Sequence, residues 1–180
     1  KWREKGFQNK LVTIEVNGVK SLSDGFEFDV IPDRIEAGTF LIAGALCGNE
    51  VEILNSNPKH LENVITKLQE CGSELIINGD KIKIIGKKII NAVDITTKPY
   101  PGFPTDLQAQ WLALMCKSNG TAKITEGIYL DRFTHVAELK RLGANINLDN
   151  NVALVKGIDS LKGAPVMSTD KIGRASCRER

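Results

Sequence analysis

The sequence contains the same order of expected secondary-structure elements twice, at an offset of 71 residues. Helix breakers and apolar positions both coincide under this shift, which is typical of an internal duplication in which each copy folds as one supersecondary unit. Two unrelated α/β segments are the alternative interpretation. The coincident pairs are Gly72 with Gly143, Gly86 with Gly157, Leu68 with Leu139, Ile53 with Ile124, and Phe40 with Trp111.

Each copy is expected to fold in the order helix, strand, helix, strand, strand. The first helix of the first copy ends before Gly48, a residue type that commonly terminates helices. Asn57-Pro58 then combines an N-cap residue with a proline at the first helical position. The expected elements are helix 35–47, strand 51–54, helix 58–71, strands 74–77 and 82–85, helix 107–117, strand 122–125, helix 133–142, and a hairpin over 145–156.

Two short strands are expected ahead of the first copy. Leu11–Val16 is rich in β-formers and is followed by Asn17-Gly18, a dipeptide typical of two-residue hairpin turns. Val19 is therefore expected to begin the returning strand, and residues 27–31 are expected to form a second short strand.

An aspartate precedes the first helix of each copy, and a third such opening occurs near the end of the chain. The three residues are Asp33, Asp106 and Asp170. No apolar helical run follows Asp170, so we expect the chain to be part of a longer protein. We further hypothesise that the basic segments 1–10 and 171–180 do not belong to the native gene.

The distribution of charge argues against a nucleic-acid-binding domain. The formal net charge of the 180 residues is +2, but segments 1–10 and 171–180 each contribute +3 and the 160 residues between them carry −4. No apolar run approaches the roughly 20 residues of a membrane-spanning helix, and residues 1–10 do not resemble a signal peptide. These features predict a cytoplasmic protein that binds neither nucleic acid nor membrane.

The cysteines form no Cys-x-x-Cys pair and have no histidine-rich segment beside them, so neither a zinc site nor a disulfide framework is expected. Three of them end apolar helical runs or precede a helix-stopping glycine and are expected to be small buried hydrophobic residues. They are Cys47, Cys71 and Cys116.

Asp106 is the carboxylate with the most distinctive setting. The proline-rich aromatic segment Tyr100–Pro104 leads stiffly to it at a helix N-terminus. A general base needs such rigid placement, because proton transfer requires the donor and acceptor atoms to lie within hydrogen-bonding reach. An ordinary helix N-cap formed by Thr105 or Asp106 is the alternative interpretation.

Arg132 lies at a strand-to-helix junction, where its guanidinium fork suits a carboxylate or phosphate. A surface salt bridge is the alternative. The sequence contains neither a glycine-rich phosphate loop nor a nucleophile elbow.

Three separated motifs closely resemble the UDP-N-acetylglucosamine 1-carboxyvinyltransferases of the enolpyruvyl transferase family. The resemblance runs from about Leu11 to Asp170, and the motifs occur in the family's order. They are Pro32–Phe40, Pro101–Gln110 and Asp131–Val136.

The resemblance implies an α/β fold, an inside-out α/β barrel built from repeated βαβαββ units, of which this chain holds about two. It implies that residues 1–10 are a head outside the family, 11–30 the last strands of a first domain, 31–98 and 99–164 two repeats of a second domain, and 165–180 the truncated start of a third repeat with a tail outside the family.

The resemblance also implies a reaction and a set of site residues. The family transfers the enolpyruvyl group of phosphoenolpyruvate to the 3-hydroxyl of UDP-N-acetylglucosamine, releases phosphate, and thereby begins peptidoglycan synthesis, with no metal or organic cofactor and no obligate protein partner. By position, Asp106 matches the general base, Ile128 a contact to the nucleotide sugar, Arg132 a contact to phosphoenolpyruvate, and Asp170 a second active-site aspartate.

The resemblance leaves alternatives for the parent protein and for this piece of it. The parent protein could instead be a 3-phosphoshikimate 1-carboxyvinyltransferase, or a relative that binds the sugar nucleotide without turnover. The loop cysteine, the lysine and the arginines that the family carries in its first domain match no residue here. We therefore expect the isolated chain to be inactive.

Overall fold

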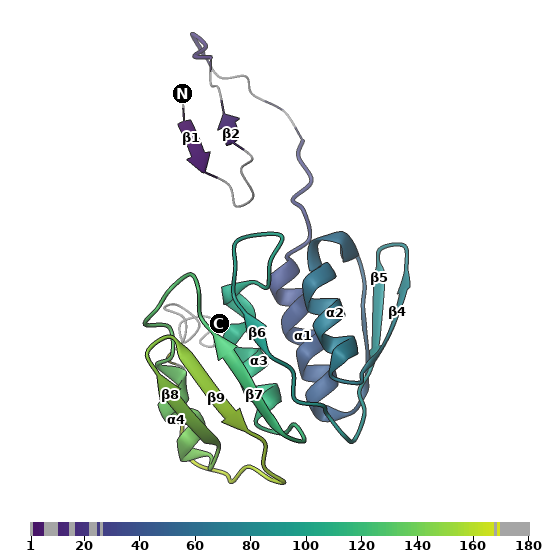
Figure 1. The fold of residues 1–180 in the computed structure, drawn as a ribbon. Coiled ribbons are helices and arrows are strands. Elements are labelled where there is room, and N and C mark those ends of the chain that lie inside the picture. The colour runs from purple at the N-terminus through teal and green to yellow at the C-terminus, as the bar shows by residue number, and fades with distance from the viewer. Residues whose placement is uncertain are drawn as a thin grey trace. The chain divides into compact units, whose positions relative to one another are not determined.

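A computed structural model describes residues 2–5, 11–14, 17–21, 25, 27–167 and 169. The chain forms two compact units, residues 1–31 and residues 32–180 (Figure 1). The first unit is a two-stranded antiparallel sheet of β1 (Trp2–Lys5) and β2 (Leu11–Ile14), in which Trp2 lies opposite Ile14.

The two strand predictions for this unit were wrong in part. Leu11–Ile14 is a strand, but it pairs with the segment before it, and residues 17–20 belong to no strand. Residues 27–31 are also not a strand, and the side chains of Phe28 and Val30 are exposed. A β-rich segment becomes a strand only when a partner satisfies its backbone N–H and C=O groups, and local composition does not specify that partner.

The first half of the second unit contains a three-stranded antiparallel sheet in the order β3-β5-β4. Its first helix begins where Asp33 accepts hydrogen bonds from two backbone N–H groups, and it ends at Gly48, whose φ is 67°. Asn57 likewise caps the next helical segment, accepting from the N–H of Lys59. The elements are α1 (Arg34–Cys47), β3 (Glu50–Ile53), η1 (Pro58–Leu61), α2 (Glu62–Glu70), β4 (Glu74–Asn78) and β5 (Lys81–Ile85).

The second half contains a four-stranded sheet in the order β6-β7-β9-β8, in which only the β6–β7 pairing is parallel. The predicted helix 107–117 is a short 3-10 turn followed by a shorter α-helix. The elements are β6 (Ile95–Thr96), η2 (Thr105–Leu107), α3 (Gln108–Met115), β7 (Thr121–Thr125), α4 (His135–Arg141), β8 (Asn145–Asp149) and β9 (Val152–Lys156).

The two halves have closely corresponding hairpins. Strands β4 and β5 become β8 and β9 when shifted by 71 residues, and the pairing register is preserved, since Glu74 lies opposite Ile85 and Asn145 opposite Lys156. Helices α1 and α3 pack against each other, and each also contacts its own sheet, as Figure 1 shows. The chain therefore has a mixed α/β fold.

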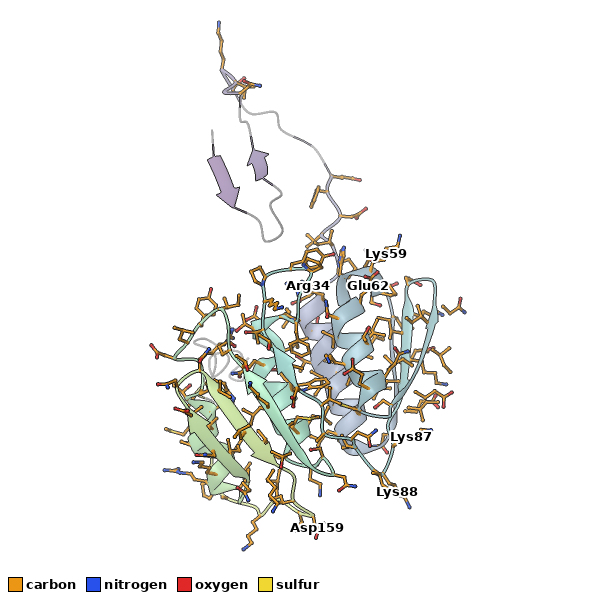
Figure 2. All side chains as sticks on the ribbon, viewed as in Figure 1. Arg34, Lys59, Glu62, Lys87, Lys88 and Asp159 are labelled. Carbon is orange, nitrogen blue, oxygen red and sulfur yellow. The ribbon has the colours of Figure 1, made fainter. Side chains whose placement is uncertain are left out.

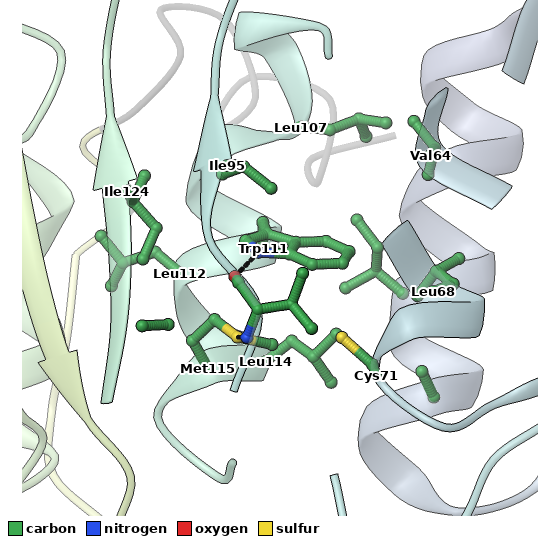
Figure 3. Packing of buried hydrophobic residues seen from close by; sticks show 14 of the residues in the cluster. Val64, Leu68, Cys71, Ile95, Leu107, Trp111, Leu112, Leu114, Met115 and Ile124 are labelled. Carbon is green, nitrogen blue, oxygen red and sulfur yellow. Dashed lines mark hydrogen bonds between the residues drawn. The ribbon is translucent and has the colours of Figure 1, made fainter. Parts of the chain in front are cut away.

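The core is centred on the fully buried Trp111 of α3 (Figure 3). Its indole N–H donates to the carbonyl of Val93 at 3.3 Å, so the one polar atom of the side chain is satisfied. Leu68 of α2 and Ile124 of β7 are fully buried in the same cluster. This packing holds the N-terminal end of α3 in a defined position.

Two equivalent glycines allow the backbone to approach the ends of the first helices. A Cβ on Gly157 would lie 1.6 Å from the carbonyl oxygen of Ser118, and one on Gly86 would lie 2.5 Å from that of Gly44. Both distances are too short for a real atom, so these positions require glycine because of close contact.

The cysteine prediction was correct for Cys71 and Cys116, which are buried, and wrong for Cys47, which is exposed. Cys47 is the last residue of α1, and the apolar period did not reveal that the helix end faces solvent. Among the described residues, no helix is long and apolar enough to cross a membrane.

Candidate active site

The segment that leads to Asp106 is held at several points. The side chain of Asn63 in α2 donates to the carbonyl of Pro101 at 2.6 Å, and Phe103 packs edge-on against Trp111 with ring centroids 5.3 Å apart. Asp106, in η2 at the start of α3, is therefore presented from an anchored segment.

Arg132 reaches Asp106 directly. One terminal nitrogen of its guanidinium, Nη2, donates to Asp106 Oδ1 at 3.0 Å, and the other, Nη1, donates to the hydroxyl of Thr105 at 3.1 Å. The Arg132 side chain is only 13% exposed, whereas that of Asp106 is 46% exposed. Arg132 therefore forms an ion pair, as in the alternative interpretation, but a largely buried guanidinium that bridges two side chains is not a solvated surface pair.

The N-cap interpretation of this aspartate is not supported. Asp33 caps α1 through its side chain, but the N-cap residues of η2 and α3 are Pro104 and Leu107, and neither makes a side-chain cap hydrogen bond. The Asp106 carboxylate instead accepts from the guanidinium of Arg132.

The turn between β7 and α4 is organised by a residue that the sequence analysis missed. Glu126 is fully buried, and its carboxylate accepts hydrogen bonds from two backbone N–H groups of this turn and from two threonine hydroxyls. The alternation of side chains along β7 could have predicted that Glu126 is buried. Ala122 and Ile124 point inward, and the period of two places residue 126 on the same face.

An open pocket of about 640 Å³ lies beside Asp106. Three of the four predicted site residues, Asp106, Ile128 and Arg132, line it together. The fourth, Asp170, lies outside the described residues. The remaining lining residues are Tyr129, Leu130 and Asp131.

The pocket combines one guanidinium with two carboxylates. The Arg132 guanidinium also lies near the Tyr129 ring, with its carbon 5.8 Å from the ring centroid. Such a cation can hold an anionic ligand through paired N–H donors, while Asp106 can accept a proton from a neighbouring hydroxyl. Among the residues that the structure describes, no group of histidine, cysteine or acidic side chains could hold a metal ion.

A larger pocket, of about 740 Å³, contains none of the predicted site residues. Its lining includes Lys87, Lys88 and Asp159, which lie at the opposite end of the second unit from Arg34 and Glu62 at the starts of α1 and α2 (Figure 2). The smaller pocket is the candidate site because it brings together three of the predicted residues, two of which are hydrogen-bonded to each other.

Comparison with known protein families identifies the family of this chain. Residues 7–176 match the family model described as EPSP synthase (3-phosphoshikimate 1-carboxyvinyltransferase). The chain belongs to this family. Proteins similar to this EPSP synthase family member carry different names, so individual relatives were compared.

A curated relative from Geotalea daltonii, named UDP-N-acetylglucosamine 1-carboxyvinyltransferase, is 48% identical over 164 residues, which cover 91% of this chain and 39% of the relative. Among solved structures, the enolpyruvyl transferase NikO from Streptomyces tendae matches with a TM-score of 0.63 at 25% identity, covering 71% of this chain and 31% of that one. An EPSP synthase from Acinetobacter baumannii matches in fold, with a TM-score of 0.57 at 14% identity, covering 79% of this chain and 36% of the other.

Proposed function

We propose that this chain is part of a UDP-N-acetylglucosamine 1-carboxyvinyltransferase. This enzyme would transfer the enolpyruvyl group of phosphoenolpyruvate to the 3-hydroxyl of UDP-N-acetylglucosamine, release phosphate, and serve peptidoglycan synthesis. The observation that carries the proposal is the hydrogen-bonded pair of Arg132 and Asp106 in one pocket, at 3.0 Å. The relative from Geotalea daltonii, 48% identical over 164 residues, supports this choice of substrates.

The proposed roles follow from charge and geometry. Arg132 holds the anionic phosphoenolpyruvate through its fork, and Asp106 accepts the proton of the sugar 3-hydroxyl while that oxygen attacks C2 of the enolpyruvyl group. C3 gains a proton during this addition. When phosphate leaves, C3 loses a proton and the enol double bond is restored, so the group arrives unchanged on the sugar.

An anionic substrate would compete with Asp106 for the guanidinium of Arg132. In the structure this carboxylate accepts from Nη2 of Arg132. Phosphoenolpyruvate that takes over this donor would remove one hydrogen bond from the Asp106 carboxylate.

The remaining roles belong to the same proposal. Ile128, whose backbone N–H is held by Glu126, contacts the nucleotide sugar, and Asp170 takes part in the proton transfers at C3. The hydroxyl of Thr134 donates to the carbonyl of Thr169 at 3.1 Å, so residue 169 lies close to the segment that follows Arg132.

We extend the proposal to the architecture of the whole protein. The chain spans 39% of the Geotalea daltonii relative, and we infer an inside-out α/β barrel in which residues 11–30 end a first domain, 31–98 and 99–164 are two repeats of a second domain, and 165–180 begin a third repeat. The family model matches residues 7–176, so only residues 1–6 and 177–180 lie outside that match. The protein would act in the cytoplasm without a metal, an organic cofactor or an obligate protein partner.

The isolated chain is expected to be inactive. Catalysis that expels phosphate depends on preorganised charges in a site from which water is excluded. The described pocket is open, and the proposed site is completed by the opposite wall of a cleft.

The main competing function is transfer to shikimate 3-phosphate, because the matched family carries the name of that activity. A chimera distinguishes the two. The matched residues of the Geotalea daltonii relative are replaced by those of this chain, and phosphate release from phosphoenolpyruvate is measured with each acceptor.

The expected result is phosphate release with UDP-N-acetylglucosamine and none with shikimate 3-phosphate. The reverse preference would assign the other activity. Binding of UDP-N-acetylglucosamine without turnover, with the unmodified relative active in the same assay, would identify a non-catalytic binder. The 180-residue chain alone should release no phosphate with either acceptor.

A further inference from the structure

Glu126 is the one fully buried acidic side chain among the described residues. A buried carboxylate is costly unless hydrogen-bond donors replace its hydration. Here Oε1 accepts from the hydroxyl of Thr97 at 2.6 Å and from the N–H groups of Ile128 and Tyr129 at 2.9 and 3.1 Å, while Oε2 accepts from the hydroxyl of Thr105 at 2.9 Å. The four donors come from three separate segments of the chain.

The hydrogen bond from Thr105 connects this buried charge to the pocket. A hydroxyl has one proton to donate, and Thr105 donates it to Glu126. The lone pairs of the Thr105 oxygen are thereby directed toward Arg132, whose Nη1 donates to it at 3.1 Å while Nη2 donates to Asp106 at 3.0 Å. One chain of hydrogen bonds thus runs from Glu126 to Thr105, Arg132 and Asp106.

A second connection runs through the backbone. Glu126 holds the N–H groups of Ile128 and Tyr129, both of which line the pocket. The carbonyl of Tyr129 in turn accepts from the N–H of Arg132 at 3.0 Å. The same carboxylate is therefore linked to Arg132 both through Thr105 and through the turn.

We propose that Glu126 is a positioning residue for the transferase, one that orients Arg132 and Asp106 through Thr105 and through the turn of residues 127–129. This inference rests on the proposed function only for its kinetic consequence. A carboxylate suits this position because two neighbours are backbone N–H groups, which only donate, and both threonine hydroxyls are oriented to donate. Thr97 accepts from the N–H of Gly127, and Thr105 accepts from Nη1 of Arg132. A glutamine would present its NH2 group to one of these four neighbours and could not accept from all four.

The orientation of Arg132 can be tested without any activity, by NMR of the 180-residue chain. In the unsubstituted chain the guanidinium is held through both terminal nitrogens, so its two NH2 groups should give separate, slowly averaging signals, assigned by their loss in Arg132→Lys. In Glu126→Gln and Thr105→Val the guanidinium should rotate more freely, so that its two NH2 signals merge. Thr105→Ser, which keeps the hydroxyl, should preserve them.

The kinetic consequence is tested in the chimera. Glu126→Gln and Thr105→Val should each raise KM for phosphoenolpyruvate roughly tenfold to a hundredfold, as expected for a lost hydrogen bond to a charged group. The double variant should lose little more than either single variant, because both break one chain of hydrogen bonds. Thr105→Ser, which keeps the hydroxyl, should have the KM for phosphoenolpyruvate of the unsubstituted chimera.

Asp94→Asn is the matched control. The Asp94 carboxylate also accepts a backbone N–H of β7, from Lys123 at 2.7 Å, but it does not line the pocket. The proposal is overturned if Glu126→Gln and Thr105→Val keep the guanidinium signals and KM at the values of Asp94→Asn, or if their kinetic losses simply add. An inactive unsubstituted chimera would refute the proposed function, while the NMR result still decides the role of Glu126. If Glu126→Gln fails to fold, Thr105→Val and Thr105→Ser decide it.

Discussion

Arg132 and Asp106 are 26 residues apart in sequence, and their side chains meet at 3.0 Å. The cation comes from the turn between β7 and α4, and the anion from the start of α3. Each residue therefore depends on a different element for its position, and the pair forms only when the second half of the fold is complete. The first two predictions concern the two members of this pair.

Replacing Arg132 by lysine should weaken phosphoenolpyruvate binding while leaving the net charge unchanged. Lysine cannot donate to Thr105 and Asp106 through a planar fork. In the chimera we expect KM for phosphoenolpyruvate to rise about tenfold or more, from the loss of a charged hydrogen bond. Arg141→Lys on α4 is the control, since that side chain is 61% exposed. Equal KM values for the two variants would contradict a binding role for Arg132.

Asp106→Asn should reduce kcat with little effect on folding. The amide keeps the shape of the side chain but cannot accept the hydroxyl proton, and general-base catalysis typically contributes about 10²- to 10⁴-fold. Steady-state phosphate release in the chimera measures the loss, and thermal unfolding checks the fold. Asp131→Asn, which lines the same pocket, should retain most of the activity. A comparable loss in both variants would point to pocket electrostatics and away from a base at residue 106.

The cysteines should differ sharply in reactivity toward iodoacetamide at about pH 8. Burial raises the pKa of the Cys71 thiol to about 12 and that of Cys116 to about 11. Because the thiolate is the nucleophile, both should stay unmodified in the folded chain. Exposed Cys47 should react. Mass spectrometry of tryptic peptides measures modification at each site, and denaturant should make Cys71 and Cys116 reactive as well.

The same shifts predict a pH dependence of stability. A thiol whose pKa is raised on folding favours the folded state below its unfolded pKa, and this contribution is lost as the pH rises toward the folded value. The free energy of unfolding should therefore fall between about pH 9 and about pH 12. Cys71→Ala, measured by urea unfolding across that range, should reduce the slope. An unchanged slope would contradict a buried neutral thiol.

Gly157→Ala should destabilise the second unit. The new methyl group would meet the carbonyl of Ser118 at 1.6 Å, so the backbone must shift, and overpacking of this kind typically costs about 1–3 kcal/mol. Gly163→Ala is the control, because nothing lies within 4 Å of its Cβ position. Urea unfolding compares the two, and equal midpoints would show that the close approach is absent in solution.

Helix ends and tight hairpins were predictable because their signals act over a few residues. Asp33 and Asn57 satisfy backbone N–H groups two or three positions ahead, and Gly48 adopts the left-handed conformation that ends α1. The turn at Asn78-Gly79 joins β4 to β5 as expected. Strand partners were harder, since Leu11–Ile14 pairs with a segment that composition did not single out.

The sequence by itself determined the order of elements from α1 to β5 and from α3 to β9, the helix caps, and the 71-residue correspondence of the two hairpins. These depend on periodicity and on the backbone preferences of single residues. Only the tertiary structure decided that Arg132 meets Asp106 and that Glu126 lies buried beneath them. A buried carboxylate is tolerated because Thr97, Thr105 and the turn after β7 converge on it, and that convergence is created by the packing of distant segments.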